Sequence, residues 1–521
     1  MLHILTGRAG SGKTTQVLRR MREAGERRPQ LLLVPEQASF ETERRFCREN
    51  GNQAGRYGEV LSFTRLENRV LSLGGGAAEP VLDAGGRLLV LYAALRSVQA
   101  NLTVYAMPSQ KPAFLTSLLT TLDELKSYCI TGEQLTQVGE ETEGMDGEKL
   151  RDLGLIFGAY EAMTARGALD PRDRLTRLAE KLRRFPFFQG QDVYLDGFTD
   201  FTPQQGLVLA ELLRQAHSVT LALTYGEGAG EEAVFAPARK TLAWIKGLAA
   251  KVGCPVEEEA LPAGEWERTP PLRHLEQALF AHPMPSYTGP WDGSIVVHEL
   301  PSPREEVAWA AGEIRALVRQ GRVRYRDIVV TARSMDPYWE QLEGVFAQYD
   351  IPLFQADKTD LLQKPLFTLI TAALDAVNGG YLYEDMFRYL KTGLAGLSLP
   401  ECDQLENYVL TWDIWGSRWT GAGGWTRHPG GYHQRFTPQD EETLETLNAL
   451  RLRVIQPLER LRKNAGGTIG EQVLALYRFL EEIHAPEHLE ARSAALLHQG
   501  EPELARQYSQ LWEIFCRALE Q

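Results

Sequence analysis

The sequence has 521 residues, of which 43% are hydrophobic and 24% charged, a composition typical of a globular protein with about three or four domains. Its net charge of −13 argues against a protein that coats nucleic acid non-specifically, but it permits a local basic groove. No apolar run approaches the roughly 20 residues of a membrane span, and the five separated cysteines form no C-x-x-C pair, so we expect a cytoplasmic protein with reduced thiols and no membrane partner.

The chain opens on a phosphate-binding motif. The apolar run Leu2–Leu5 leads into a full G-x-x-x-x-G-K-[ST] match, and residues 15–24 then follow a helical pattern. Glycines let backbone N–H groups approach phosphate oxygens, while Lys13 can reach the β- and γ-phosphates and Thr14 can ligate Mg²⁺. We therefore expect ATP and Mg²⁺ to bind at the motif, which comprises Gly7, Arg8, Ala9, Gly10, Ser11, Gly12, Lys13 and Thr14.

Strands and helices alternate after this motif. The continuous apolar run at residues 31–34 predicts a central strand of a parallel sheet, and a charged helix pattern follows at 41–48. A third strand is expected at residues 60–65, with a helix at 66–73. This alternation predicts an α/β fold whose ligand-binding residues lie at the carboxyl ends of parallel strands.

Residues 85–185 are expected to be helical, because leucines recur there at three- and four-residue spacing. We interpret this stretch as an insertion in the first α/β domain. The sheet is expected to return with an apolar strand that ends at Asp196 and with another strand at 219–224. A polar, proline-containing connection follows at residues 226–290.

A second α/β unit is predicted from residue 294 onward. Strands are expected at 294–300, 327–333 and 351–354, with helices at 305–319 and 338–349. From Pro365 the pattern is helical again, interrupted by a loop at 421–431 that is rich in glycine, tryptophan and histidine. The helical rhythm continues to the last residue, so we expect the chain to be part of a larger protein.

The residues around the predicted phosphate site suggest nucleotide binding without efficient hydrolysis. Asp196 stands where a second carboxylate would hold Mg²⁺ through water, but its neighbour is Gly197, where many such enzymes carry a glutamate that activates water. Losing a positioned base commonly lowers a rate by about 10²–10⁴-fold. Arg333, at the end of a predicted strand, fits either a γ-phosphate contact or a solvated arginine.

A second group of residues lies at the carboxyl ends of the predicted strands, on the same rim of the sheet as the phosphate-binding motif. Aromatic faces for base stacking, together with an arginine and an amide for base edges, are what a groove for single-stranded nucleic acid requires. We therefore interpret the group as a candidate DNA-binding surface, comprising Gln37, Ser39, Phe63, Arg65, Phe198 and Phe201. A single phenylalanine at such a position is more often part of the core than a stacking platform, so the interpretation rests on the group as a whole.

Taken together, these motifs resemble the AddB (RexB) family, one of the two subunits of the bacterial ATP-dependent helicase–nuclease. The resemblance covers essentially the whole chain, and its most specific part is the Asp-Gly-Phe…Phe-Thr-Pro signature. It rests on segments 7–14, 33–37, 63–66, 196–204, 404–408 and 417–420. It implies a superfamily 1 helicase-like core, in which Asp196 matches the Walker B aspartate and Arg333 an arginine of the second RecA-like domain.

The resemblance implies an α/β fold with two RecA-like P-loop NTPase domains and two helical insertion domains. The first RecA-like domain is expected at 1–84 plus 186–290, with a helical insertion at 85–185. The second is expected to start at 291–364, with its own helical insertion, apparently truncated, at 365–521.

The resemblance also implies a role in double-strand break repair, in a heterodimer with AddA that acts on duplex DNA ends. The AddB polypeptide would bind ATP and single-stranded DNA and sense the Chi hotspot, with its own motor inactivated. The full-length family also carries a 4Fe-4S cluster and a nuclease Mg²⁺ site that this chain is not expected to encode. The alternatives are an active superfamily 1 helicase motor and a P-loop small-molecule kinase.

Overall fold

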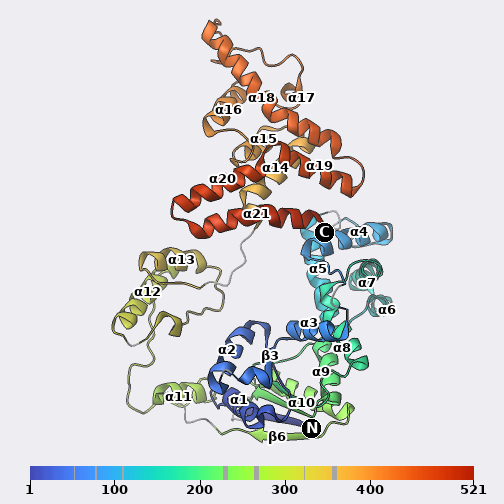
Figure 1. Cartoon of the computed structure of the whole chain (residues 1–521), viewed down its shortest axis with the longest axis vertical. Coiled ribbons are helices and arrows are strands. Elements are labelled where there is room, and N and C mark those ends of the chain that lie inside the picture. The colour runs from blue at the N-terminus through green and yellow to red at the C-terminus, as the bar shows by residue number, and fades with distance from the viewer. Residues whose placement is uncertain are drawn as a thin grey trace. The chain divides into compact units, whose positions relative to one another are not determined.

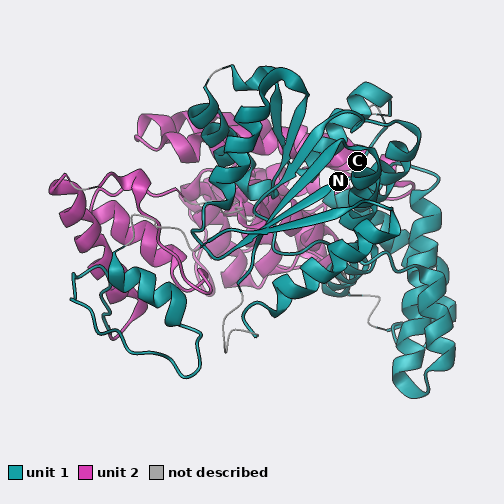
Figure 2. Cartoon of the chain, turned by 90° about the horizontal axis from the view of Figure 1, so that it is seen from below, with its two compact units in different colours: residues 1–299 teal, residues 300–521 magenta. Residues whose placement is uncertain are grey.

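The computed structural model describes residues 1–51, 53–76, 79–107, 111–226, 233–262, 269–321, 323–354 and 361–520 (Figure 1). The chain divides into two compact units, Met1–Glu299 and Leu300–Gln521, which Figure 2 colours separately. Among the described residues, no helix is both long enough and apolar enough to cross a bilayer.

The first unit is built on a six-stranded sheet in the order β3-β2-β4-β5-β1-β6, and every neighbouring pair is parallel. Parallel neighbours need crossover connections, which the helices between the strands provide. The strands are β1 (Leu2–Gly7), β2 (Gln30–Leu33), β3 (Gly58–Leu61), β4 (Asp192–Leu195), β5 (Ser218–Thr224) and β6 (Val256–Ala260).

Helices cover both faces of this sheet, so its central strands are apolar on both sides. Alternation along β2 shows the arrangement: Leu31 and Leu33 belong to one core cluster, while Leu32 belongs to the other. Helices α1 (Lys13–Ala24) and α2 (Ser39–Asn50) pack on the second face. The first face carries α3 (Phe63–Gly74), α8 (Arg174–Arg184), α9 (Pro203–Gln215) and α10 (Ala236–Lys251).

Strand β6 lies in the region expected to be a polar connection, so that expectation was wrong. Its residues include Glu257, Glu258 and Glu259, so the strand has no apolar run by which it could be predicted. Their carboxylates face basic groups of neighbouring elements: Glu258 lies 2.5 Å from Lys246 Nζ, and Glu259 lies 2.5 Å from an Arg20 nitrogen. Charged side chains are common on edge strands, where they discourage pairing with other chains.

Between β3 and β4 the described chain is helical, as the leucine spacing predicted. After α3 come α4 (Ala84–Val98), α5 (Pro112–Ser127), α6 (Gly132–Glu141), α7 (Gly144–Thr164) and α8. Leucines of α4 and α5 and aromatic residues of α7 share one apolar cluster. A buried carboxylate, Asp170, ties these helices together through ion pairs with Arg87 and Lys126.

Helices are the only regular secondary structure among the described residues of the second unit, and the strands expected from residue 294 onward were wrong. Residues 294–300, 327–333 and 351–354 form no strand. Apolar side chains in these segments are open to solvent: Val297 is 88% exposed, Val329 81% and Phe354 91%. An apolar run becomes a strand only when a neighbouring strand accepts its backbone hydrogen bonds, and no such neighbour exists among the described residues.

Ten α-helices are described in the second unit. Two of them, α12 (Pro303–Arg319) and α13 (Trp339–Gln348), form a small cluster, and the later ones share a larger core. The later helices are α14 (Pro365–Gly379), α15 (Tyr383–Leu390), α16 (Leu399–Trp412), α17 (Ser417–Thr420), α18 (Pro438–Asn464), α19 (Ile469–Glu482), α20 (Ala485–His498) and α21 (Pro502–Glu520). The division into RecA-like domains and insertions stays a prediction.

Candidate functional site

The loop between β1 and α1 has the backbone of a phosphate cradle. Gly10 and Gly12 have φ angles of 82° and 87°, which residues with a Cβ rarely adopt. Gly12 also precedes α1 directly, so the positive end of the helix dipole faces the loop. Lys13 is buried, and its Nζ donates to the carbonyl oxygens of Gly7 and Arg8, each at 2.8 Å.

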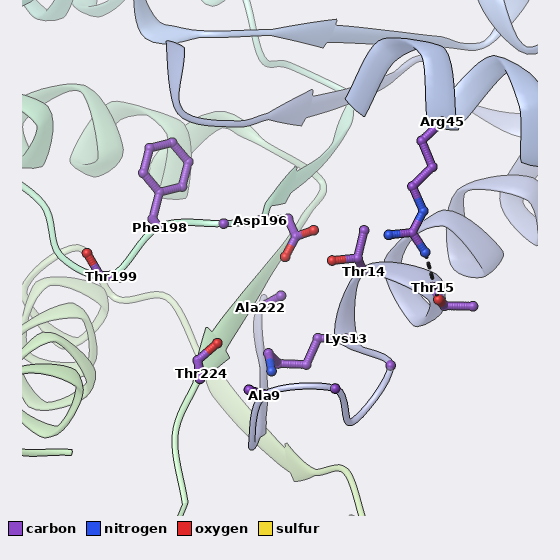
Figure 3. Close-up of a pocket in the computed structure, with 13 residues that line it drawn as sticks. Ala9, Lys13, Thr14, Thr15, Arg45, Asp196, Phe198, Thr199, Ala222 and Thr224 are labelled. Atoms are coloured by element: carbon purple, nitrogen blue, oxygen red, sulfur yellow. Dashed lines mark hydrogen bonds between the residues drawn. The ribbon is translucent and has the colours of Figure 1, made fainter. Parts of the chain in front are cut away.

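This loop borders a pocket of about 330 Å³ at the carboxyl ends of the strands (Figure 3). The sheet order places β5 between β1 and β4, so Asp196 after β4 meets Lys13 and Thr14 after β1. In Figure 3 the carboxylate of Asp196 and the hydroxyl of Thr14 turn toward one another. The pocket is lined by Ala9, Gly10, Gly12, Lys13, Thr14, Thr15, Arg45, Asp196, Gly197, Phe198, Thr199, Ala222 and Thr224.

The donor set of the pocket fits a magnesium-bound polyphosphate. Thr14 and Asp196 offer the hydroxyl and carboxylate oxygens that Mg²⁺ prefers, with phosphate oxygens and waters expected to complete an octahedron. Burial lowers the pKa of Lys13, and the charges of Asp196 and Glu276 only partly oppose that effect. A phosphate beside Nζ would supply the missing negative charge. The volume lies near the lower end of the roughly 300–1,000 Å³ seen for ligand pockets, as suits a phosphate chain.

Two cationic side chains at this site have roles that sequence reasoning did not identify. Arg45 of α2 lines the pocket, where its Nη2 donates to Thr15 Oγ1 at 3.0 Å. The side chain of Arg8, within the motif, pairs with Glu276 of α11 (Pro270–Ala278) at 2.9 Å and lies over the ring of Phe235. No local pattern could reveal these contacts, because the partners are distant in sequence.

Gly197, next to Asp196, adopts a φ of 80°. A Cβ built at this position would lie 3.3 Å from Pro35 Cδ, closer than an ordinary van der Waals contact. The position where related sites carry a glutamate is therefore shaped for glycine, and the backbone itself opposes any side chain there.

The left-handed backbone at residue 197 opposes any side chain there. We therefore expect Gly197→Glu to lower the free energy of unfolding by about 1–2 kcal/mol. We also expect ATP hydrolysis by this variant to stay undetectable, because the same backbone opposes a productive position for the new carboxylate. Thermal unfolding and a phosphate-release assay with single-stranded DNA would measure both effects. The control is Gly197→Ala, which should lose similar stability without adding a carboxylate. DNA-stimulated hydrolysis by the glutamate variant at unchanged stability would contradict this account.

The candidate DNA-binding residues before and after β3 lie at the same rim. Gln37 is exposed in a short 3-10 turn (Glu36–Ala38), and Ser39 Oγ donates to the Glu36 carbonyl at 3.0 Å. The third strand ends earlier than expected, because Ser62 caps α3 by accepting a hydrogen bond from Arg65 N at 3.2 Å. Arg65 therefore stands in the first turn of a helix, where it is exposed and pairs with Glu43 at 3.0 Å.

A carboxylate, Glu36, joins the two parts of this rim. Its Oε1 accepts a hydrogen bond from Thr64 N at 3.0 Å. Burial would raise the pKa of Glu36, but hydrogen bonds from Thr64 and Ser62 outweigh burial and lower it. The glutamate is therefore held ionised, and it fixes the start of α3 beside the turn that carries Gln37.

The three candidate phenylalanines form one aromatic row. Phe63 and Phe198 are only 6% and 9% exposed, and they meet edge-on with centroids 5.7 Å apart. Phe201 lies 5.0 Å from Phe198 and stacks on Trp244 at 6.0 Å. The rings of Phe63 and Phe198 have no exposed face on which a base could stack. Base stacking by these two residues therefore stays a prediction, and it requires the aromatic rings to move apart. Sequence reasoning missed Trp244, which is partly exposed.

Arg333 belongs to the second unit, where it is exposed at a bend outside any helix or strand. Its expected γ-phosphate contact therefore stays a prediction.

Comparisons with known proteins agree on one family. The family model described as "ADDB, N-terminal" matches residues 4–276. Proteins named as the B-type subunit of an ATP-dependent helicase/deoxyribonuclease, from Acetivibrio thermocellus and Desulforudis audaxviator, are 32% and 34% identical over the whole of this chain and 47% of their own lengths. The protein of that name from Clostridioides difficile is 32% identical over 46% of its length. The chain thus spans about half the length of these relatives.

Proposed function

Since the chain belongs to the AddB family, we propose that it is the helicase-like part of the AddB polypeptide of an ATP-dependent helicase–nuclease, which processes DNA double-strand breaks for recombinational repair. In this proposal it binds ATP, Mg²⁺ and single-stranded DNA, works with an AddA partner and senses the Chi hotspot. Its own motor does not turn over nucleotide efficiently. The nuclease and iron–sulfur functions would lie in the half of the relatives that this chain does not span.

One observation carries the proposal of an inactive motor. Of the described residues that line the phosphate pocket, Asp196 is the only one with a carboxylate. When nucleotide is bound, Mg²⁺ would neutralise phosphate charge, and Asp196 would serve that ion. No second carboxylate is then left in the lining to accept a proton from an attacking water. Asp200 does not line the pocket, and it accepts a hydrogen bond from Thr199 Oγ1.

The polar rim supports the single-strand part of the proposal. Gln37 offers an amide and Arg65 a guanidinium, both exposed at the carboxyl ends of the same parallel sheet. Phe201 and Trp244 extend this rim with a stacked aromatic pair. Amides and arginines can read base edges, and aromatic rings can stack on unpaired bases.

Three measurements on the purified chain separate this proposal from its rivals: ATP affinity, ATP hydrolysis and affinity for oligothymidylate. We expect it to bind both ligands with little hydrolysis, even when DNA is present. Rapid DNA-stimulated hydrolysis would instead indicate an active motor. ATP binding without any DNA affinity would favour a small-molecule kinase.

We expect Arg65→Ala to weaken binding of single-stranded DNA at least about tenfold, because one charged hydrogen bond contributes about 1.5–3 kcal/mol and about 1.4 kcal/mol is tenfold in affinity. Fluorescence anisotropy with a labelled oligonucleotide would measure the change. Arg69→Ala is a matched control, because Arg69 lies one turn along the same helix and pairs with Glu59 at 3.4 Å. Equal losses of DNA affinity in the two variants would contradict a specific role for Arg65.

A further inference from the structure

The second unit contains a loop whose charge differs sharply from that of the whole protein. Residues 414–439 include three arginines and no aspartate or glutamate, whereas the full chain carries a net charge of −13. The arginines are Arg418, Arg427 and Arg435, and all three are exposed. A positive surface that interrupts an acidic protein attracts anions locally.

Several exposed arginines of this unit are paired with carboxylates, but these three are not firmly paired. Arg388 contacts Asp375 and Asp385, and Arg453 contacts Glu401. In the described part of the chain, no carboxylate forms an ion pair with Arg427 or Arg435, and Arg418 reaches Asp413 only at 4.0 Å.

Aromatic rings stand beside these arginines. Trp415 is 52% exposed and Tyr432 is 64% exposed. The guanidinium of Arg418 lies 6.0 Å from the Trp415 ring centroid, and that of Arg427 lies 4.8 Å from Trp412. Tyr432 also contacts Trp412, with centroids 4.3 Å apart. Guanidinium groups and rings placed side by side can hold phosphates and unpaired bases together.

The loop is held rigidly, although little of it is helical. Trp412 Nε1 donates to the His428 carbonyl at 3.1 Å, and Tyr408 Oη donates to the Arg427 carbonyl at 3.0 Å. Trp425 is buried, and its Nε1 donates to the Arg418 carbonyl at 2.9 Å. These bonds fix the backbone at two of the three arginines, so little ordering is required when a ligand binds.

A pocket of about 600 Å³ borders the same loop and adds positive charge. It is lined by residues 420–424 and by residues of α18, including Arg451 and Lys463. Arg451 is buried, and its Nη1 donates to the carbonyls of Trp419 and Gly421 at 2.6 and 3.2 Å. Among the described residues, no carboxylate pairs with this guanidinium. Glu459 also lines the pocket, but its carboxylate already contacts Tyr381 and Arg462.

We propose that residues 415–436 form a second contact for single-stranded DNA, in addition to the rim of the first unit. Arg418, Arg427 and Arg435 would take the phosphates, while Trp415 and Tyr432 would stack on bases. A duplex hides its base faces, so exposed rings favour the single strand. An acidic protein surface would match the arginines but would give the exposed aromatic rings no equivalent partner.

The test uses the full chain and oligothymidylate carrying 5-iododeoxyuridine for photo-cross-linking. We expect cross-linked peptides from residues 415–436 as well as from the first unit. Cross-links confined to the first unit would overturn the proposal without affecting the one made for Arg65. A fully paired hairpin should compete at least about tenfold more weakly for the second-unit cross-link, because stacking contributes about 1–3 kcal/mol per base.

Affinity measurements complete the test. In an Arg65→Ala background, the pair Arg427→Ala and Arg435→Ala should weaken oligothymidylate binding about tenfold and reduce the salt dependence by about 0.7 per arginine. Arg388→Ala is the control from the same unit. Thermal unfolding checks that each variant is folded. Unchanged affinity and salt dependence in the folded double variant would overturn the proposal and leave the loop as a surface for a protein partner.

Discussion

Lys13→Ala is expected to weaken ATP binding by at least about 100-fold, the largest effect on ATP affinity that we expect from a single change in the first unit. Nζ carries the only buried ammonium among the described residues that line the phosphate pocket. Charged hydrogen bonds contribute about 1.5–3 kcal/mol each, and a triphosphate offers this ammonium more than one acceptor. Isothermal titration with ATP and Mg²⁺ would measure the loss.

The matched control for this variant is Lys246→Ala, which removes an exposed lysine paired with Glu258 on the edge strand. It should leave ATP affinity unchanged. Lys13 also holds the carbonyls of Gly7 and Arg8, so the thermal stability of both variants must be compared. Retained ATP binding by a folded Lys13→Ala variant would refute the phosphate-loop assignment.

Wild-type ATP affinity should also depend on pH in a way that reports on Lys13. Burial lowers the pKa of Lys13 in the free protein. A bound phosphate would stabilise the protonated amine and so raise this pKa again. Affinity should therefore fall as pH rises through the lowered pKa, beginning below the usual range for lysine. An affinity that is constant up to that usual range would contradict a direct contact between Nζ and phosphate.

Asp170→Ala is expected to lower the free energy of unfolding by about 3–5 kcal/mol, the range for breaking a buried ion pair. The Asp170 carboxylate is fully buried; Oδ1 pairs with Arg87 Nε at 2.9 Å and Oδ2 with Lys126 Nζ at 3.0 Å. It also accepts hydrogen bonds from Tyr160 Oη and Arg172 N, both at 2.9 Å. Its removal leaves two buried cations short of a partner. Urea unfolding followed by circular dichroism would measure the loss.

Asp173→Ala is the control, because Asp173 pairs with the same Lys126 from a partly exposed position. Asp173→Ala should lower the free energy of unfolding by less than about 1 kcal/mol. Burial would raise the pKa of Asp170, but the backbone of Arg172 and the charges of Lys126 and Arg87 outweigh it and lower the pKa. The stabilisation is therefore present at neutral pH and lost as pH falls below the usual range for a carboxyl group. Equal losses for the two variants would show that Asp170 has no special place in the network.

Sequence patterns were most reliable where a local signal was sufficient. The turn between β1 and α1 could be predicted because the glycines, Lys13 and Thr14 belong to one short motif, and phosphate binding there stays a prediction. The central strands β2, β4 and β5 could be predicted because helices on both faces require continuous apolar runs. The edge strand β6 was missed for the opposite reason, since its glutamates are stabilised by basic partners from other elements.

By itself, the sequence determined the glycine-rich turn between β1 and α1, the family and the helical character of residues 85–185, because spacing along the chain carries those signals. Only the tertiary structure decided that Asp196 meets Lys13 across β5, that the rings of Phe63 and Phe198 are buried, and that Gly197 has a left-handed backbone. It also decided that the apolar runs at residues 294–300, 327–333 and 351–354 form no strand. Pairing and burial depend on partners that are distant in sequence, so no local pattern encodes them.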